Sequence, residues 1–246
     1  MSESEVTYGS YLALDELLSL QRLRSSPEHP DELLFIVVHQ ASELWFKLIL
    51  HELSGLNDRF DANDTLGGLT SIRRVNALVR IVTSQLSALE TLPPQHFAQF
   101  RGYLGTSSGS QSGQFRAIEA VSGLRDPHFI QVLEDHGGIP PIVQRALERP
   151  PLQTQFINLI TASGATLADI YADEQHRPMQ MLAEGLLEYE QGFAMWRFLH
   201  VQLVERIIGP DVGGTGGTLG ARYLQRTISQ KFFPDLWAIR GGFYKG

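Results

Sequence analysis

Three long segments of the chain repeat apolar residues at the 3.6-residue spacing of an α-helix, and this periodicity constrains the fold more than any other feature. The first segment is predicted to run from about Glu32 to about Leu56, with Asp31 as its N-cap. One broad face of this segment carries Phe35, Val38, His39, Ser42, Trp45, Phe46 and Ile49. Because such a face needs other helices to cover it, the segment is predicted to lie in a helical core.

Two further long helices are predicted, from about Leu69 to about Leu92 and from about Met179 to about Ile208. The first ends before a Pro-Pro pair, and the second ends at a Gly-Pro pair that cannot continue a helix. Shorter helices are expected over residues 10–23, 95–103, 111–121, 126–134, 140–148, 151–171 and 218–230. Since no linker separates two cores and no repeat is found, residues 1–246 are predicted to form one all-α domain, a helical bundle.

The composition excludes several classes of function. Hydrophobic residues make up 43% of the 246 residues and charged residues 19%, which is typical of a folded domain. A formal net charge of -7 argues against nucleic acid as a partner. Without cysteine the chain has no disulfide, zinc-thiolate site or iron–sulfur cluster, so a metal or cofactor would be held by histidine, carboxylates or backbone.

The sequence is also expected to be that of a soluble cytoplasmic protein. The most apolar stretch, Leu33 to Leu56, is interrupted by His39, Glu43 and Lys47, among others, and so lacks the roughly 20 clean apolar residues of a membrane span. The first residues show neither the basic start nor the apolar run of a signal peptide.

Two histidines lie on apolar helix faces. His39 comes one turn after Phe35, and His200 comes one turn after Trp196. A buried imidazole without a partner costs on the order of 1–3 kcal/mol, so each needs a hydrogen bond or a ligand. Each is either a core histidine satisfied by nearby acceptors or a ligand. Because neither has a His-x-x-x-His or Glu-x-x-His companion, the proximal position of a heme suits such a residue better than a multi-ligand metal site does.

Two Gly/Ser-rich stretches, Gly102 to Gly113 and Gly209 to Gly220, interrupt the helical pattern. The second carries no phosphate-loop motif; it is either a linker or a mobile lid whose backbone amides and Thr215 hydroxyl close over a ligand. Arg101 immediately precedes the first stretch. Its charge either complements the end of a helix or clamps a carboxylate through its rigid fork.

Taken together, these segments resemble the tryptophan 2,3-dioxygenase family. The resemblance rests on blocks that occur in the family's order and span most of the chain: YGSYLALDELLSLQ (8–21), DELLFIVVHQASELWFKLILHEL (31–53), FRGYLGTSSGSQSGQFR (100–116), MWRFLHVQLVERIIG (195–209), GTGGTLG (214–220) and KFFPDLWAIR (231–240). It implies an all-α fold around a b-type heme and a homotetramer. It also implies insertion of both atoms of O2 across the indole C2–C3 bond of L-tryptophan, which gives N-formylkynurenine.

The resemblance also implies roles for individual residues. His200 matches the proximal heme ligand, with Trp196 beside it, and His39 matches the distal histidine that hydrogen-bonds the indole N–H. Phe35 and Phe97 match the substrate pocket, Arg101 matches the arginine that pairs with the substrate carboxylate, and Thr215 matches the loop threonine near the amino-acid end. Ser108 and Gly109 match the loop on the distal side of the heme. Tyr8 and Tyr11 match tyrosines that help close a neighbouring subunit's site, so residues 1–25 are expected to contact that subunit.

Departures from the family pattern keep the substrate open. Leu199 replaces an arginine before the proximal histidine, and Ser110 replaces a bulky aromatic. Phe97 stands where some relatives have tyrosine, Thr218-Leu219 replaces the usual Ser-Ser, and the chain is short for the family. The first hypothesis is therefore a dioxygenase acting on L-tryptophan or a close derivative. The second is a heme monooxygenase of the same fold that converts a substituted tryptophan to an oxindole. The third is a non-catalytic protein that binds heme or indoles.

Overall fold

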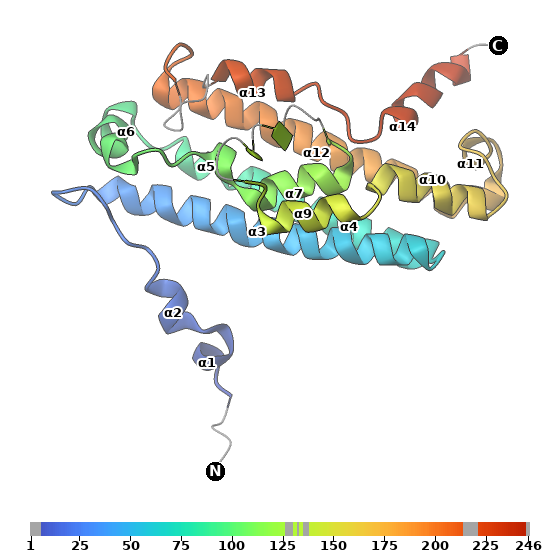
Figure 1. Ribbon diagram of the computed structural model, residues 1–246, viewed down its shortest axis with the longest axis horizontal. Helices are drawn as coiled ribbons and strands as arrows, with labels where there is room; N and C mark the ends of the chain where they lie inside the picture. The colour runs from blue at the N-terminus through green and yellow to red at the C-terminus, as the bar shows by residue number, and fades with distance from the viewer. Residues whose placement is uncertain (1–5, 126–129, 132, 135–137, 214–220, 245–246) are drawn as a thin grey trace.

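The computed structural model describes residues 6–125, 130–131, 133–134, 138–213 and 221–244. Three long helices form its body: α3 (Pro30–Asp61), α4 (Thr65–Ser84) and α12 (Arg177–Ile208). Helix α4 packs against both α3 and α12, and α7 (Gly113–Ser122), α9 (Pro141–Glu148) and α10 (Leu152–Ala162) lie along this body (Figure 1). No strand occurs in the described ranges, which confirms the all-α prediction there.

The shorter elements complete the chain. They are α1 (Tyr8–Leu12), α2 (Leu14–Leu18), α5 (Leu86–Leu89), α6 (Pro94–Arg101), α11 (Asp169–Ala172), α13 (Ala221–Thr227) and α14 (Pro234–Ala238), with the 3-10 helices η1 (Gly102–Leu104), η2 (Gly109–Gln111), η3 (Glu174–His176) and η4 (Ile239–Tyr244). The predicted helix over 126–134 falls largely outside the described residues.

The start of α3 differs from its prediction by two residues. His29, rather than Asp31, is the N-cap: its Nδ1 accepts a hydrogen bond of 3.2 Å from the Asp31 N–H, and Pro30 occupies the first helical position. Proline fits there because its missing N–H would have no partner in the helix. Asp31 then lies in the first turn, where its negative charge complements the helix dipole.

Three predicted helices are each divided in the structure. The helix expected over residues 10–23 becomes α1 and α2, which are separated by Ala13 with a left-handed φ of 48°, and it ends at Leu18. The helix expected over Leu69–Leu92 becomes α4 and α5, and near the division the Ser84 hydroxyl donates to the Ile81 carbonyl at 2.9 Å. Such side-chain bonds compete with the helical ladder. The helix expected over 151–171 ends at Ala162, because Gly164 adopts a left-handed φ of 79° and the chain turns before α11.

Close packing between α4 and α12 depends on two glycines. A Cβ added at Gly192 would lie 2.7 Å from Val79 Cγ1, and one at Gly185 would lie 2.9 Å from Ile72 Cγ2. Asn76 Nδ2 also donates to the Gly185 carbonyl at 3.0 Å across this contact. The two helices therefore approach each other closely, and this packing fixes the position of α12 and of the residues in its second half.

A buried carboxylate fastens the C-terminal segment to α12. Glu190 accepts hydrogen bonds from the backbone N–H groups of Phe232 and Phe233 at 2.7 and 2.8 Å, and from Trp237 Nε1 at 2.6 Å. Because these donors satisfy the carboxylate, its charge is tolerated in the core.

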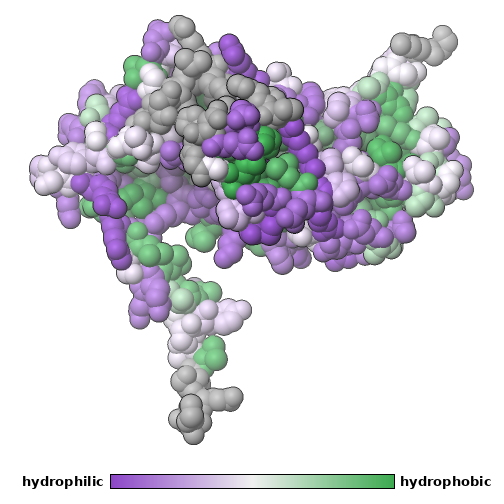
Figure 2. All heavy atoms as spheres, viewed as in Figure 1, coloured by the Kyte–Doolittle hydropathy of each residue, from purple (hydrophilic) through white to green (hydrophobic). Residues whose placement is uncertain are grey.

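The N-terminal arm, residues 6–21 with α1 and α2, projects away from the helical body (Figure 1). Exposed apolar side chains lie along it, including Val6, Leu12, Leu18 and Leu20 (Figure 2). Since isolated short helices have little stability of their own, such an arm needs a partner surface to hold it.

Helix α3 carries a second uncovered apolar surface, formed by Leu33, Val37, Leu44 and Leu48. An 18-residue stretch of α3 has a mean hydropathy of 1.6, which together with the helix length suffices for a membrane crossing, and 17% of that stretch is buried within the chain. The expectation that no segment is long and apolar enough to cross a membrane is therefore wrong. Core and interface helices of soluble proteins meet the same criteria.

Candidate functional site

A cavity of about 250 Å³ lies between α3, α5, α6, α7 and the second half of α12. Its walls are mostly apolar, with a few polar groups among them, as is typical of sites for small molecules and cofactors. Eight of the predicted site residues line it: Phe35, His39, Phe97, Arg101, Ser108, Gly109, Trp196 and His200. The fold therefore brings together residues that are up to 165 positions apart in the sequence, since Phe35 and His200 differ by that number.

His200 lies on α12 with its ring stacked on that of Trp196, at a centroid distance of 5.0 Å and an interplanar angle of 20°. Burial, together with the nearby charge of His39, lowers the pKa of His200 to about 4. The imidazole is therefore neutral at pH 7 and offers a nitrogen lone pair. No hydrogen-bond partner of this ring occurs among the described residues, so the alternative of a core histidine satisfied by protein acceptors finds no support there.

His39 lies on α3, one turn after Phe35. Its Nδ1 is 2.7 Å from the Phe35 carbonyl oxygen, which can only accept, so Nδ1 carries the proton. Burial lowers the pKa of His39, although the Phe35 carbonyl and the carboxylate of Glu43 oppose this change. The neutral ring thus keeps its Nε2 as a hydrogen-bond acceptor, and it suits a ligand that presents an N–H group.

Aromatic rings form one wall of the cavity. The Phe35 ring lies 4.1 Å from that of His39 and 5.4 Å from that of Phe97, between centroids. Phe100 packs behind them at 5.9 Å from Phe35 and is fully buried. Rings held in this way present a rigid apolar surface, which is suited to a flat aromatic ligand.

Arg101, the last residue of α6, is the cationic group of the cavity wall. Its Nη2 donates a hydrogen bond to the Gly213 carbonyl, which ties α6 to the segment that follows α12. A guanidinium has five donors in a fixed fork, so this contact leaves others for a carboxylate. Thr215, predicted to act at the same end of the substrate, lies outside the described residues.

The segment from Ser108 to Ser112 lines another part of the cavity. Ser108 caps η2: its Oγ accepts from the Ser110 N–H at 3.3 Å, while its own N–H donates to Gln111 Oε1 at 3.2 Å. Ser112 in turn caps α7 by accepting from the Phe115 N–H at 3.1 Å. These caps hold a Gly/Ser-rich stretch in a defined conformation against the ligand space.

Glu43 and Phe115 are among the lining residues that were not predicted from the sequence. Glu43 lies one turn after His39 and accepts from Gln114 Nε2 at 2.8 Å, and Phe115 lies 4.9 Å from the Trp196 ring. The i, i+4 spacing from His39 was a usable signal for Glu43. Phe115 gave no such signal, because α7 meets α12 only through tertiary packing.

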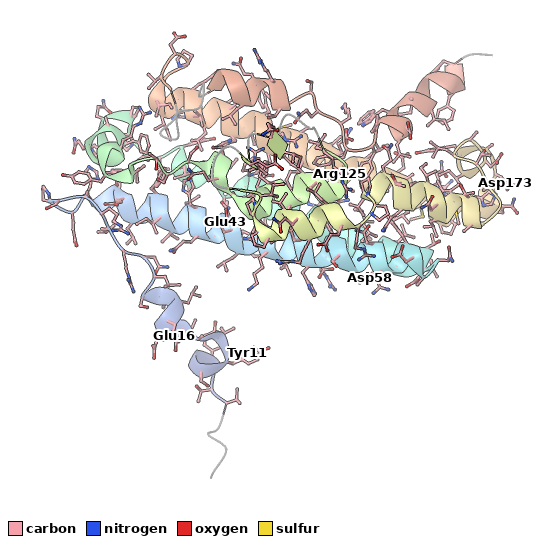
Figure 3. The ribbon with its side chains drawn as sticks, viewed as in Figure 1. Tyr11, Glu16, Glu43, Asp58, Arg125 and Asp173 are labelled. Atoms are coloured by element: carbon pink, nitrogen blue, oxygen red, sulfur yellow. The ribbon has the colours of Figure 1, made fainter. Side chains whose placement is uncertain are left out.

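The two N-terminal tyrosines lie elsewhere. Tyr8 and Tyr11 are each 77% exposed on the N-terminal arm and do not line the cavity of their own chain. Figure 3 shows Tyr11 on this arm, well away from Glu43 of the cavity wall. Their predicted role in a neighbouring subunit's site stays a prediction.

The donor set of the cavity suits a cofactor that supplies most of its own metal ligands. Within the described ranges, no group of three or more histidine, cysteine, aspartate or glutamate side chains could hold a metal ion. A single neutral histidine on an apolar wall instead fits a protein ligand of a heme iron. The aromatic and aliphatic lining fits the apolar faces of a porphyrin.

Comparison with known proteins gives a consistent result. A family model described as tryptophan 2,3-dioxygenase matches residues 1–136 and 154–242. Proteins named tryptophan 2,3-dioxygenase from Kineococcus radiotolerans, Herpetosiphon aurantiacus and Bacillus anthracis are 40%, 42% and 36% identical, over 96%, 96% and 97% of this chain. The alignments cover 91%, 97% and 93% of those relatives. Compared with these relatives, the chain is not unusually short, and that expectation is wrong.

Proposed function

Because the chain belongs to the tryptophan 2,3-dioxygenase family, we propose that it inserts both atoms of O2 across the indole C2–C3 bond of L-tryptophan, giving N-formylkynurenine. The observation that carries this proposal is the cavity that His39 and His200 share. One wall offers a histidine suited to a metal, and the other offers a hydrogen-bond acceptor beside an aromatic surface.

His200, with Trp196 stacked against it, would hold a non-covalent heme b through its imidazole. When bound, the heme supplies the iron-centred redox chemistry by which O2 reacts with the indole ring. Ser108 and Gly109 are proposed to contact it from the 108–112 segment. The chain's contribution is to keep the His200 lone pair unprotonated, which its buried position achieves.

Three groups are proposed to fix the substrate. Arg101 binds the carboxylate, His39 Nε2 accepts the indole N–H, and the rings of Phe35 and Phe97 pack on the indole faces. Together they hold the amino-acid end and the ring in one orientation, which raises the rate by proximity. Because the indole N–H is a very weak acid, His39 orients the ring through a hydrogen bond and does not remove this proton.

Residues 1–246 are proposed to act as one heme oxygenase domain within a homotetramer. The uncovered apolar residues of α3 and of the N-terminal arm support contacts between copies. On binding a neighbouring subunit, the arm brings Tyr8 and Tyr11 to that subunit's cavity, and Thr215 is proposed to bind the amino-acid end of the substrate. Together they exclude water from the reacting groups.

The test is reconstitution of the purified chain with hemin, followed by reduction and addition of L-tryptophan and O2. We expect O2 consumption and the appearance of N-formylkynurenine, with tetramer mass by light scattering. A protein that takes up heme but consumes no O2 with L-tryptophan or its ring- and β-substituted analogues contradicts the proposal.

A further inference from the structure

A second, smaller cavity of about 40 Å³ adjoins the first. It shares Trp196 and His200 with the larger cavity, and it is further lined by Arg116, Glu119, Arg197 and Thr227. Burying charged side chains at the edge of an apolar site costs free energy unless they are paired.

The charged residues form a buried network behind Trp196. Glu119 Oε1 accepts from Arg197 Nη2 at 2.8 Å, and Glu119 Oε2 accepts from Arg116 Nη1 at 2.8 Å. The side chains of Arg116, Glu119 and Arg197 are 9%, 6% and 3% exposed. Both oxygens of the Glu119 carboxylate are therefore hydrogen-bonded, and the guanidinium groups of Arg116 and Arg197 share this one carboxylate.

Two N–H groups beside the small cavity have no acceptor among the described residues. Of the buried side-chain polar atoms without a hydrogen-bond partner in the described part of the chain, four are amide oxygens of residues that line neither cavity. The other two are N–H groups of adjacent residues, Trp196 Nε1 and Arg197 Nε. Leaving a buried donor unsatisfied carries its full desolvation penalty, and both of these residues line the small cavity.

We propose that the small cavity receives a carboxylate, held by Arg197 Nε and Trp196 Nε1, and that this carboxylate is a propionate of the bound heme. The assignment rests on the proposed function, since it places the heme against His200. A carboxylate is the matching chemistry because it only accepts hydrogen bonds and its charge complements a guanidinium. The shared wall formed by Trp196 and His200 connects this anion site to the space next to the axial ligand.

The experiment compares two ligands on the full-length apoprotein: hemin and hemin dimethyl ester, whose propionates carry no charge. Affinities are measured by Soret titration for the wild type, Arg197→Met and Trp196→Phe. We expect Arg197→Met to weaken hemin binding about 10-fold or more, as for a charge-assisted hydrogen bond, and to leave ester binding unchanged. Trp196→Phe keeps the ring and is expected to cause a smaller loss, again for hemin only.

Arg125→Met is the matched control. Arg125 is a partly buried arginine that donates to the carbonyl oxygens of Ala120, Ala146, Leu147 and Arg149 and lines neither cavity. Its loss is expected to change the affinities for hemin and ester by the same factor. Should Arg197→Met not fold, the ratio of hemin to ester affinity in the wild type and in Trp196→Phe still decides the proposal.

Equal losses for hemin and ester in Arg197→Met and Trp196→Phe overturn the assignment. The assignment is also overturned if the wild type binds hemin and ester equally and added chloride stabilises the wild type but not Arg197→Met. The occupant is then a small free anion. If neither ligand gives a Soret shift, the proposed function fails as well. If hemin and ester bind with equal affinity in the wild type and in both variants, and tryptophan is oxygenated, the anion site alone is wrong.

Discussion

His39 of α3 and His200 of α12 line one cavity, close enough that the charge of one imidazole lowers the pKa of the other. Among the described residues, only one of the two has a backbone partner: His39 Nδ1 donates to the Phe35 carbonyl. The two rings therefore differ in what they offer. His39 presents an acceptor to a ligand, and His200 presents a free lone pair to a metal.

His200→Ala is expected to abolish stable heme binding, because it removes the proposed iron ligand. The variant should fold, since it replaces a cavity-lining side chain and leaves the α4–α12 contact intact, and it should lose the Soret band. Added imidazole should restore the band in part. His51→Ala, on the exposed side of α3, is the control and should retain heme. A His200→Ala protein that purifies with full heme and an unchanged Soret band rules out the ligand assignment.

His39→Ala should retain heme and lower kcat/KM for L-tryptophan about fivefold, as expected when one neutral hydrogen bond of about 1 kcal/mol is lost. With 1-methyl-L-tryptophan, which lacks the indole N–H, wild type and variant should have the same affinity. Steady-state kinetics and ligand titrations measure both effects. A fall of 10²-fold to 10⁴-fold would instead indicate general-base catalysis and contradict the orienting role.

Arg101→Leu should weaken binding of L-tryptophan by about 1.5–3 kcal/mol, the range for a hydrogen bond to a charged group. Binding of tryptamine, which has no carboxylate, should not change. Arg74→Leu is the matched control, because Arg74 is an exposed arginine paired with Glu52 at 3.0 Å. An unaltered dissociation constant for L-tryptophan in Arg101→Leu removes this residue from the site.

Glu32→Gln tests how the segment before α3 is held. The Glu32 carboxylate accepts from the backbone N–H groups of Arg24 and Ser25 at 2.8 and 3.0 Å and from the Ser25 hydroxyl. Burial alone would raise the pKa of Glu32, but these hydrogen bonds outweigh it and hold the pKa below the ordinary 4.5. The variant should lose about 1–3 kcal/mol of stability at pH 7.

The pH dependence of this difference has a definite sign. A lowered folded-state pKa stabilises the protein above pH 4.5, and this contribution is lost as the pH falls through the folded-state value. Urea unfolding of wild type and Glu32→Gln should therefore give curves that separate at pH 7 and converge below pH 4.5. A difference in the free energy of unfolding that stays constant with pH would show that the charge of the Glu32 carboxylate does not contribute.

The periodic part of the fold was predictable from the sequence. The positions and faces of α3 and α12 follow from apolar spacing, and the end of α12 follows from Gly209, whose φ is 87°. The divisions at Gln85 and Gly164 were not predicted. They depend on single side-chain hydrogen bonds and one left-handed residue, which hydrophobic periodicity does not register.

For the site, residue chemistry alone identified His39 and His200 as polar groups on apolar faces that need a partner. The resemblance to a known family supplied the distant residues that share the cavity, such as Ser108 and Phe97. Neither source indicated the network of Arg116, Glu119 and Arg197, because its members come from α7 and α12 and meet only when those helices pack. Tertiary contacts of this kind leave no fixed spacing in the sequence.

The most direct test of the account is the product mass of the hemin-reconstituted protein turning over L-tryptophan under ¹⁸O₂. The account predicts N-formylkynurenine carrying two labelled oxygen atoms, formed in step with O2 consumption. A product with a single labelled oxygen atom, an oxindole, would show a monooxygenase of the same fold. No labelled product from L-tryptophan would contradict the proposed reaction outright.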